Sequence, residues 1–220
     1  MSTWLVTGAN RGIGLAVCRH LVARGDDVIA ACREESAALT SLGLRVELGV
    51  DVTDSASIAQ LAQRLEGVSL DVLLNNAGVL SSERLGSLDF DAMRRQFEVN
   101  SLGPLRVTAG LLGCLGTGSK VGIVTSRMGS IGDNDSGGAY GYRMSKAAVN
   151  AAGKSLALDL RGQEIAVGIL HPGWVRTDMT RHNGLVDAPE SAAGLIARMD
   201  ALTLETTGTF WHMNGQELPW

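Results

Sequence analysis

The chain has 220 residues, 45% of them hydrophobic and 19% charged, and a formal net charge of −4 at pH 7. That length supports one full hydrophobic core, and the composition excludes a disordered chain. Nucleic-acid binding is disfavoured, because the sequence has no basic run to contact a phosphate backbone. No apolar run approaches the roughly 18 residues of a membrane span, and the N-terminus lacks the pattern of a signal peptide.

The cysteines and glycines give two further indications. Cys18, Cys32 and Cys114 are odd in number and far apart, which is typical of reduced thiols and predicts a cytoplasmic protein. No CxxC pattern or His/Cys cluster indicates a metal site. The 28 glycines indicate a backbone that often turns tightly or approaches a ligand closely.

Short β-rich runs alternate with longer helical segments along the chain. The predicted strands span residues 3–9, 27–33, 44–50, 70–76, 120–126, 166–172 and 208–213. The predicted helices span about 12–24, 35–42, 55–66, 89–98, 101–115, 142–161 and 189–200. Most strand runs are continuously apolar, as expected when both faces of a sheet are covered. The alternation predicts an α/β fold, a single Rossmann-type doubly wound parallel sheet of about seven strands with helices on both faces.

No linker, repeat or low-complexity tract interrupts this alternation, so residues 1–220 are predicted to form one domain. In doubly wound sheets, ligands bind at the carboxyl ends of the strands, near the point where the strand order reverses. The residues that follow each predicted strand are therefore the first candidates for a functional site.

The first predicted strand runs into a glycine loop, TGANRGIG, at residues 7–14. Glycines at this spacing permit a tight turn, let the backbone approach a pyrophosphate and let helix and strand pack closely. The N-terminus of the following helix offers free N–H groups and a positive dipole end to phosphates. A glycine triplet also occurs in ordinary turns, but its position between a strand and a helix predicts a dinucleotide site. The predicted contacts are Gly8, Asn10, Arg11, Gly12, Ile13 and Gly14.

The end of the second predicted strand bears on the choice of cofactor. NAD(H) sites usually have an acidic residue about 20 residues after the glycines, which bonds the ribose 2′-hydroxyl. Cys32 occupies that place here, and Arg33 follows it. A guanidinium would attract a 2′-phosphate, and Arg11 supplies a second cation. This pattern favours NADP(H), with NAD(H) still possible.

The alternative interpretation is that Arg33 is a solvated loop residue and that Glu34 or Glu35 takes the ribose. At the end of the third predicted strand, Asp51 and Val52 are expected to contact the adenine through a carboxylate and a backbone amide.

The only two tyrosines lie close together, at Tyr140 and Tyr142. Tyr142 is followed four residues later by Lys146, so both side chains lie on one helix face. A free phenol titrates near 10, and a nearby ammonium favours the phenolate and lowers that pKa. A phenol tuned in this way can transfer protons beside a hydride acceptor. A Tyr and a Lys four residues apart are common by chance, and this pair indicates a catalytic site only together with the glycine loop.

Over nearly its whole length, the chain resembles the short-chain dehydrogenase/reductase family, in the branch with TGxxxGxG spacing. The matching motifs are TGANRGIG (7–14), DV (51–52), NNAG (75–78), EVNSLGPL (98–105), VTSRMGS (124–130), YRMSK (142–146) and HPGWVRTDM (171–179). The stretch SRMGSIGDNDSGGAYGYRMSK and the ending GQELPW are similar to the subgroup of C-factor and sniffer-type carbonyl reductases.

The resemblance implies a role for each matched residue. Tyr142 would be the acid/base, and Lys146 would hold the nicotinamide ribose and lower the pKa of the phenol. Ser126 would bond the substrate oxygen, and Asn100 would anchor a water that links Lys146 to solvent. The remaining cofactor contacts implied are Asn76, Ala77 and Gly78 on the ribose side, and Pro172, Gly173, Val175 and Thr177 around the carboxamide and the nicotinamide face.

One departure from the family pattern concerns the serine. Ser126 precedes Tyr142 by 16 residues, a few more than is usual in the family. The extra residues lie in the loop 129–138, which can bulge without moving either end, and Ser130 is the alternative substrate contact. Asn100 has a structural alternative as well, as the N-cap of the following helix.

The resemblance implies an NADP(H)-dependent enzyme that reduces a ketone or aldehyde, or oxidises the matching alcohol. The substrate would be a small molecule under a short lid at residues 178–191, and the protein would form a dimer or tetramer through the helix that carries Tyr142. The alternative function is a C-factor-like signalling protein that binds nucleotide with little catalysis. A serine hydrolase is disfavoured, because the chain has no GxSxG motif.

Overall fold

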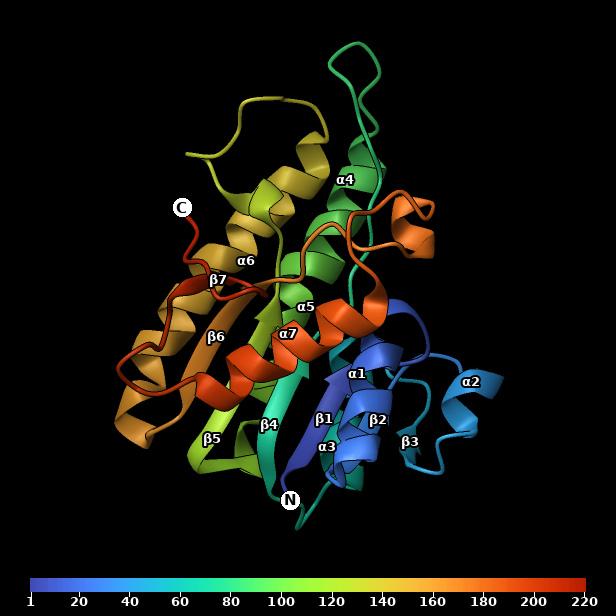
Figure 1. The fold of residues 1–220 in the computed structure, drawn as a ribbon, viewed down its shortest axis with the longest axis vertical. Helices are drawn as coiled ribbons and strands as arrows, with labels where there is room; N and C mark the ends of the chain where they lie inside the picture. Colours follow the sequence, from blue (N-terminus) through green and yellow to red (C-terminus); the bar gives the residue numbers. More distant parts are fainter.

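A computed structural model describes all residues, 1–220. Its seven strands form one sheet in the order β3-β2-β1-β4-β5-β6-β7 (Figure 1). Every pairing between neighbours is parallel, which confirms the predicted doubly wound sheet. The strands are β1 Thr3–Thr7, β2 Asp27–Ala31, β3 Arg45–Glu47, β4 Leu70–Asn75, β5 Leu115–Val124, β6 Ala166–His171 and β7 Phe210–His212.

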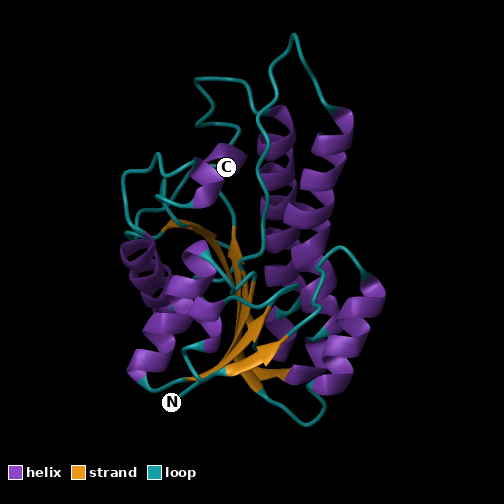
Figure 2. Ribbon diagram, turned by 90° about the vertical axis from the view of Figure 1, so that its right-hand side faces the viewer, coloured by secondary structure: helices purple, strands orange, loops and turns teal.

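Helices form a layer on each face of the sheet (Figure 2). The helices are α1 Gly12–Arg24, α2 Ala37–Thr40, α3 Ser55–Arg64, α4 Phe90–Phe97, α5 Gly103–Gly110, α6 Tyr140–Asp159 and α7 Ala188–Ala201. α1 packs against α7 in one layer, while α3 packs against α5 and α4 against α6 in the other. None of the helices combines the length and the apolar composition needed to cross a bilayer.

The continuously apolar strands follow from this layered arrangement. Trp4 and Val6 join the core cluster that contains α1 and α7 residues, whereas Leu5 between them joins the cluster on the other face. Successive side chains of a strand point to opposite faces, so a strand covered on both sides must be apolar at every position. Each of the seven predicted strands corresponds to an observed one.

The element boundaries differ from the prediction in several places. The predicted helix 101–115 is wrong at both ends: a π-helical turn, η1 Glu98–Leu102, precedes α5, and the helix stops at Gly110. β5 then begins at Leu115, five residues before the predicted strand, because an irregular pairing with β4 extends it. The third strand is shorter than predicted and ends at Glu47, so Asp51 and Val52 lie in the loop beyond it.

Candidate functional site

A cleft of about 910 Å³ opens at the carboxyl ends of the strands, beside the reversal of strand order between β1 and β4. The predicted residues that line it are Gly8, Asn10, Arg11, Gly12, Ile13, Cys32, Arg33, Asp51, Val52, Asn76, Ala77, Gly78, Tyr142, Lys146, Pro172 and Thr177. The fold therefore brings most of the predicted cofactor residues to one cavity with Tyr142 and Lys146. Gly14, Asn100, Ser126, Gly173 and Val175 are not part of the lining.

The glycine loop is closely packed against the end of β4. Gly8 has a φ of +65°, and a Cβ added there would lie 2.9 Å from the Cα of Ala77. A Cβ added at Gly14 would lie 2.4 Å from the carbonyl oxygen of Gly8. The side chain of Asn76 donates to the carbonyl oxygens of Thr7 and Gly8 and so ties β4 to the loop. Gly14 thus acts through helix–strand packing, while Gly8 and Gly12 face the cleft.

The tip of β2 presents a free cation to the cleft. Cys32 is buried, and burial raises the pKa of its thiol. Arg33 is exposed and makes no ion pair or side-chain hydrogen bond within the chain. Arg11 makes only a loose contact with Asp178, at 3.9 Å between two exposed side chains. Glu34 also lines the cleft, so the acidic alternative lies within the same cavity.

Asp51 reaches the cleft from the loop after β3, and its carboxylate is already engaged. Its Oδ1 accepts hydrogen bonds from the backbone N–H of Thr53 at 2.9 Å and from the Thr53 hydroxyl at 2.8 Å. Those two bonds lower the pKa of Asp51, with a smaller contribution from Arg33. Its other oxygen, Oδ2, makes no hydrogen bond within the chain.

Tyr142 and Lys146 lie one turn apart at the start of α6, and Ser126 at the end of β5 completes the group. The Lys146 ammonium is 5.8 Å from the centroid of the Tyr142 ring and donates to the carbonyl oxygen of Val124 at 2.9 Å. The Ser126 side chain lies near enough to the Tyr142 hydroxyl to act against the effect of burial on its pKa. By contrast, the hydroxyl of Ser130 accepts from the backbone N–H of Asp133, so it serves the turn of its own loop.

The protonation of this group differs from the prediction. Burial raises the pKa of Tyr142 to about 12, against the smaller, opposite effect of the Ser126 side chain. Burial lowers the pKa of Lys146 to about 8. The expected net lowering of the Tyr142 pKa is therefore wrong for this chain, because desolvation disfavours the phenolate more than its neighbours favour it. At neutral pH the pair consists of a neutral phenol and an ammonium.

Asn100 lies in the π-helical turn and is completely buried. Its Oδ1 accepts from the backbone N–H of Val79, and its Nδ2 donates to the Val79 carbonyl oxygen and to the Ser145 hydroxyl. It is not an N-cap, since Leu102 precedes α5 at that position. Asn100 instead joins the segment after β4 to the helix that carries Lys146.

The segment after β6 divides into lining and supporting residues. Pro172 and Thr177 line the cleft together with Met179 of the lid. Gly173 has a φ of +84°, and Val175 is buried and bridges to Val186. Gly173 and Val175 therefore do not line the cleft but stabilise the turn that carries Pro172 and Thr177.

Residues from α4 and the π-helical turn also line the cleft, and the sequence analysis gave them no role, although two of them lie in the EVNSLGPL motif. They are Arg95, Glu98 and Val99. They do not follow a strand and belong to no glycine or Tyr-Lys motif, so only the packing of α4 beside α6 brings them to the site.

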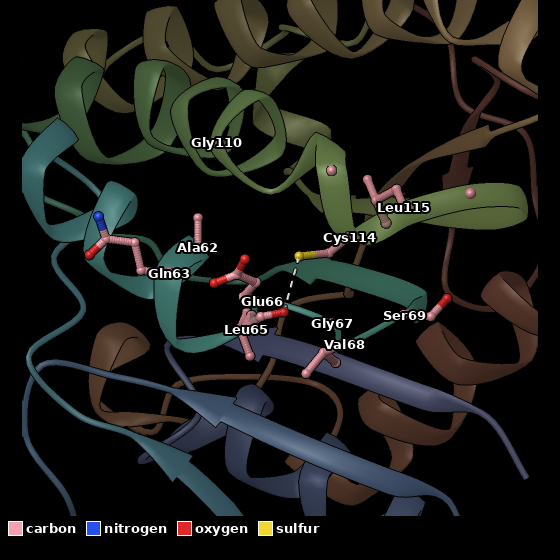
Figure 3. A pocket seen from close by; sticks show the side chains of 12 residues that line it. Ala62, Gln63, Leu65, Glu66, Gly67, Val68, Ser69, Gly110, Cys114 and Leu115 are labelled. Carbon is pink, nitrogen blue, oxygen red and sulfur yellow. Dashed lines mark hydrogen bonds between the residues drawn. The ribbon is translucent and has the colours of Figure 1, made fainter.

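A second cavity, of about 680 Å³, lies at the opposite end of β4 and β5 (Figure 3). Its lining includes four glycines and larger side chains such as Gln63, Glu66 and Leu115, and Cys114 contacts the Leu65 carbonyl oxygen there at 3.9 Å. Burial raises the pKa of this thiol, which disfavours the reactive thiolate. No predicted site residue lies in this cavity.

Comparison with known proteins agrees with the geometry of the cleft. The family model for short chain dehydrogenase matches residues 2–185. A 1-hydroxy-2-glutathionyl-2-methyl-3-butene dehydrogenase of Rhodococcus sp. strain AD45 is 49% identical over 226 residues and is covered completely, as is this chain. The C-signal of Myxococcus xanthus is 47% identical over 154 residues, which cover 69% of this chain and 93% of that protein.

Solved structures show the same relationship. The carbonyl reductase Sniffer of D. melanogaster superimposes with a TM-score of 0.94 at 30% identity, with both chains covered completely. An NADPH-bound carbonyl reductase from chicken fatty liver gives a TM-score of 0.89 at 30% identity, covering 100% of this chain and 99% of that one. The chain thus belongs to the short-chain dehydrogenase family and is an NAD(P)-dependent oxidoreductase.

Proposed function

We propose that this protein is an NADP(H)-dependent oxidoreductase that reduces a ketone or aldehyde, or oxidises the matching alcohol, with Tyr142 as the acid/base. Residues 1–220 would act as one domain that binds the cofactor and carries the catalytic residues. The observation that carries the proposal is the shared cleft: Tyr142 and Lys146 line the same cavity as the glycine loop and Arg33.

The cleft fits a dinucleotide. A Cβ at Gly8 would collide with Ala77, and a Cβ at Gly14 with the carbonyl of Gly8, so only glycines at these positions let the loop keep the shape that a pyrophosphate site needs. Arg33 is the exposed cation without a partner that a 2′-phosphate requires. The binding of NADPH by the chicken carbonyl reductase supports the same choice of cofactor. Glu34 would take the ribose if NAD(H) were the cofactor instead.

The bound nicotinamide would supply or accept a hydride. The chain's own residues would manage the proton and the geometry. Ser126 and the Tyr142 hydroxyl would both bond the substrate oxygen, and Tyr142 would donate its proton to that oxygen in reduction. The Lys146 ammonium would stabilise the phenolate that remains. Asn100 would act indirectly, by holding the segment after β4 against α6.

The protonation state suits the reductive direction. A phenol with a pKa of about 12 is protonated at neutral pH and ready to donate. Oxidation needs the phenolate first, so we expect the oxidative rate to rise with pH.

The cofactor preference is tested by titrating the protein with NADPH and with NADH. We expect NADPH to bind more tightly, and Arg33→Ala to weaken NADPH binding by about tenfold or more while NADH binding changes little. Arg19→Ala, an exposed arginine on α1, serves as the matched control and should change neither affinity. Equal or tighter binding of NADH by the unmodified protein would contradict the assignment.

The catalytic role of Tyr142 is tested with a panel of carbonyl compounds and NADPH. Tyr142→Phe should lower kcat by about 10²-fold or more, while NADPH binding persists. Full reductase activity in that variant would remove Tyr142 from the mechanism.

Two relatives suggest a more specific substrate and a different function, and the carbonyl panel and the Tyr142→Phe variant distinguish between them. The Rhodococcus relative is named for an alcohol that carries a glutathionyl group, so the panel should include S-glutathionyl alcohols with NADP⁺ and NAD⁺. The C-signal relative favours a signalling role with little catalysis. Retention of full biological function by Tyr142→Phe would support signalling over chemistry.

We also propose that the protein is a cytoplasmic homo-oligomer. Its three cysteines are free, as expected of a reducing compartment. Apolar side chains are exposed on the helical layer that includes α6, namely Phe97, Leu105, Met144 and Leu158. A second copy could cover them, whereas Gly153 packs on its own sheet against Ile169. Sedimentation of the purified protein as a monomer would contradict this proposal.

A further inference from the structure

Glu83 is a buried acidic residue in the loop after β4, and it belongs to no sequence motif. Its side chain is 3% exposed. Carboxylates are almost never buried without partners, because leaving water costs several kcal/mol per ion. The partners of Glu83 show what the buried charge does.

Three donors converge on the Glu83 carboxylate. Its Oε1 accepts from the Ser81 hydroxyl at 2.6 Å and from the Gln96 side-chain amide at 2.8 Å. Its Oε2 accepts from the backbone N–H of Gly141 at 3.1 Å. Gln96 is itself buried, and its oxygen accepts from the backbone N–H of Ser81 at 3.0 Å. The cluster is thus closed, with one hydrogen-bonding arrangement.

Gly141 is the second residue of α6, and Tyr142 is the third. The first N–H groups of a helix have no partner within the helix and are usually capped by a polar side chain just before it. Here the N-cap position is Ala139, which has no side chain able to do so and has a left-handed φ of 47°. The backbone N–H of Ala139 donates to the Glu83 carbonyl oxygen at 3.0 Å. Glu83 therefore holds the start of α6 with both its backbone and its side chain.

We propose that Glu83 is a positioning residue for the Tyr142 hydroxyl: its carboxylate caps the first turn of α6 and fixes that turn against α4. The close approach of the two helices supports this role. A Cβ added at Gly141 would lie 2.5 Å from the Gln96 amide nitrogen and 2.8 Å from Met93. The first turn therefore has no space in which to shift toward α4, and Glu83 prevents a shift away from it.

Only a carboxylate satisfies all three donors. In a Glu83→Gln variant, turning the amide oxygen toward Gly141 places the amide NH₂ against the NH₂ of Gln96. Turning it the other way places the NH₂ against the Gly141 N–H. Gln96 cannot rotate to relieve the first clash without losing its bond from Ser81. The variant keeps the shape of the side chain and leaves one donor facing another in either orientation.

The inference rests on the proposed function, since its kinetic test needs carbonyl reduction by the unmodified enzyme. We expect Glu83→Gln and Glu83→Ala to lower kcat by about 10- to 100-fold, as misplaced catalytic groups do. The Kd for NADPH should stay within about threefold of the unmodified value, because the glycine loop and Arg33 lie on other elements. General damage to the fold would instead lower kcat and the affinity for NADPH in proportion. Glu66→Gln, an exposed glutamate at the opposite end of the molecule, is the matched control.

A double variant provides the rescue. Glu83→Gln combined with Gln96→Glu restores a carboxylate to the cluster. The amide introduced at position 83 can accept from Gly141 and donate to the carboxylate at position 96, which can still accept from Ser81. We expect the double variant to recover kcat several-fold over Glu83→Gln. The proposal is overturned if folded Glu83→Gln keeps kcat within about twofold of the unmodified enzyme, if kcat and NADPH affinity fall together, or if the exchange rescues nothing.

Amide hydrogen exchange separates this proposal from the proposed function. Faster exchange confined to the peptide that contains Gly141 in Glu83→Gln, relative to Glu66→Gln, supports the cap whether or not any carbonyl compound is reduced. Unchanged exchange there overturns the cap. Absence of carbonyl reduction by the unmodified protein would instead count against the proposed function.

Discussion

Lys146 is a buried cation whose surroundings disfavour its charged form. It is 4% exposed, and the only hydrogen bond from its ammonium within the chain goes to the Val124 carbonyl oxygen. Burial of an ammonium with one neutral acceptor costs free energy, which appears as the lowered pKa of about 8. The residue therefore opposes folding at neutral pH, as groups held ready for chemistry often do.

We predict that the free-energy cost of burying the Lys146 ammonium depends on pH. Between the folded pKa of about 8 and the unfolded value of 10.5, the unfolded chain binds more protons at Lys146 than the folded chain does. The free energy of unfolding should therefore rise with pH across that window, and the full cost is present below pH 8. The shift corresponds to at most about 3 kcal/mol. Lys146→Met should remove this contribution.

Urea unfolding without added cofactor, at pH 7 and pH 10, measures the effect. The stability of Lys146→Met relative to the unmodified protein should be more favourable at pH 7 than at pH 10. Lys154→Met, at a lysine farther along α6, is the control and should show no such difference. A constant difference between Lys146→Met and the unmodified protein at both pH values would contradict the prediction.

The 3₁₀ turn after β5, η3 Arg127–Gly129, is the element that sets Ser126 beside Tyr142. Ser126 caps this turn by accepting from the backbone N–H of Met128 at 3.1 Å. The turn packs on α6 so closely that a Cβ added at Gly129 would lie 2.7 Å from the carbonyl carbon of Lys146. Direct contact between turn and helix fixes the separation of the two hydroxyl groups.

The contact between η3 and α6 explains how the separation of Ser126 and Tyr142 along the chain can exceed the usual spacing in the family. The extra residues between Ser126 and Tyr142 form a loop that is anchored both to α6, where Arg143 donates to the Ser136 hydroxyl at 2.8 Å, and to segments outside that helix. Arg127 pairs with Asp133 at 2.7 Å, and the backbone N–H of Gly132 donates to the Trp220 carbonyl oxygen at 2.8 Å. The loop can thus vary in length while both of its ends stay in place.

We predict that Gly129→Ala separates the turn from α6. Because the obstacle is backbone, the turn must move, at a cost of about 1–3 kcal/mol in the free energy of unfolding. kcat for carbonyl reduction should fall more than the affinity for NADPH, since the glycine loop is distant from the turn. Gly162→Ala, where no atom lies within 4 Å of the added Cβ, should leave both stability and kcat nearly unchanged. Equal behaviour of the two variants in urea unfolding and steady-state kinetics would refute this account of the turn.

The cleft is lined by residues from both halves of the sheet. The glycine loop and Arg33 follow β1 and β2, while Lys146 and Pro172 belong to the half built on β5 and β6. A ligand that contacts both halves binds the folded chain only, so it must stabilise the protein against unfolding.

We therefore predict that NADPH raises the melting temperature more than NADH does at equal concentration. At 100 times its Kd, NADPH should add about 2.7 kcal/mol to the free energy of unfolding. Arg33→Ala should reduce the difference between the two cofactors. Differential scanning fluorimetry measures the melting temperature of the unmodified protein and of Arg33→Ala with each cofactor. A larger increase in melting temperature with NADH than with NADPH would contradict the preference for NADP(H).

The sequence predicted the elements that have a local cause. The continuously apolar strands, the glycine loop and the Tyr142–Lys146 spacing each depend on residues close together in the chain, and the fold contains all of them. The ends of elements were less predictable. The π-helical turn at Glu98–Leu102 was not predicted, although the EVNSLGPL motif covers it, and the partners of its Asn100, Val79 and Ser145, are distant in the chain.

The amino-acid sequence was sufficient to predict the doubly wound sheet, the motifs of a nicotinamide-dependent oxidoreductase and the pair of residues at the start of α6, since periodicity and short spacing encode them. The protonation of that pair and the proposed role of Glu83 emerge from the folded structure. Desolvation depends on everything that packs around a group, and three donors from distant segments meet the Glu83 carboxylate only after α4 and α6 come together. Neither the shifted pKa values nor the hydrogen bonds to Glu83 exist before the chain folds.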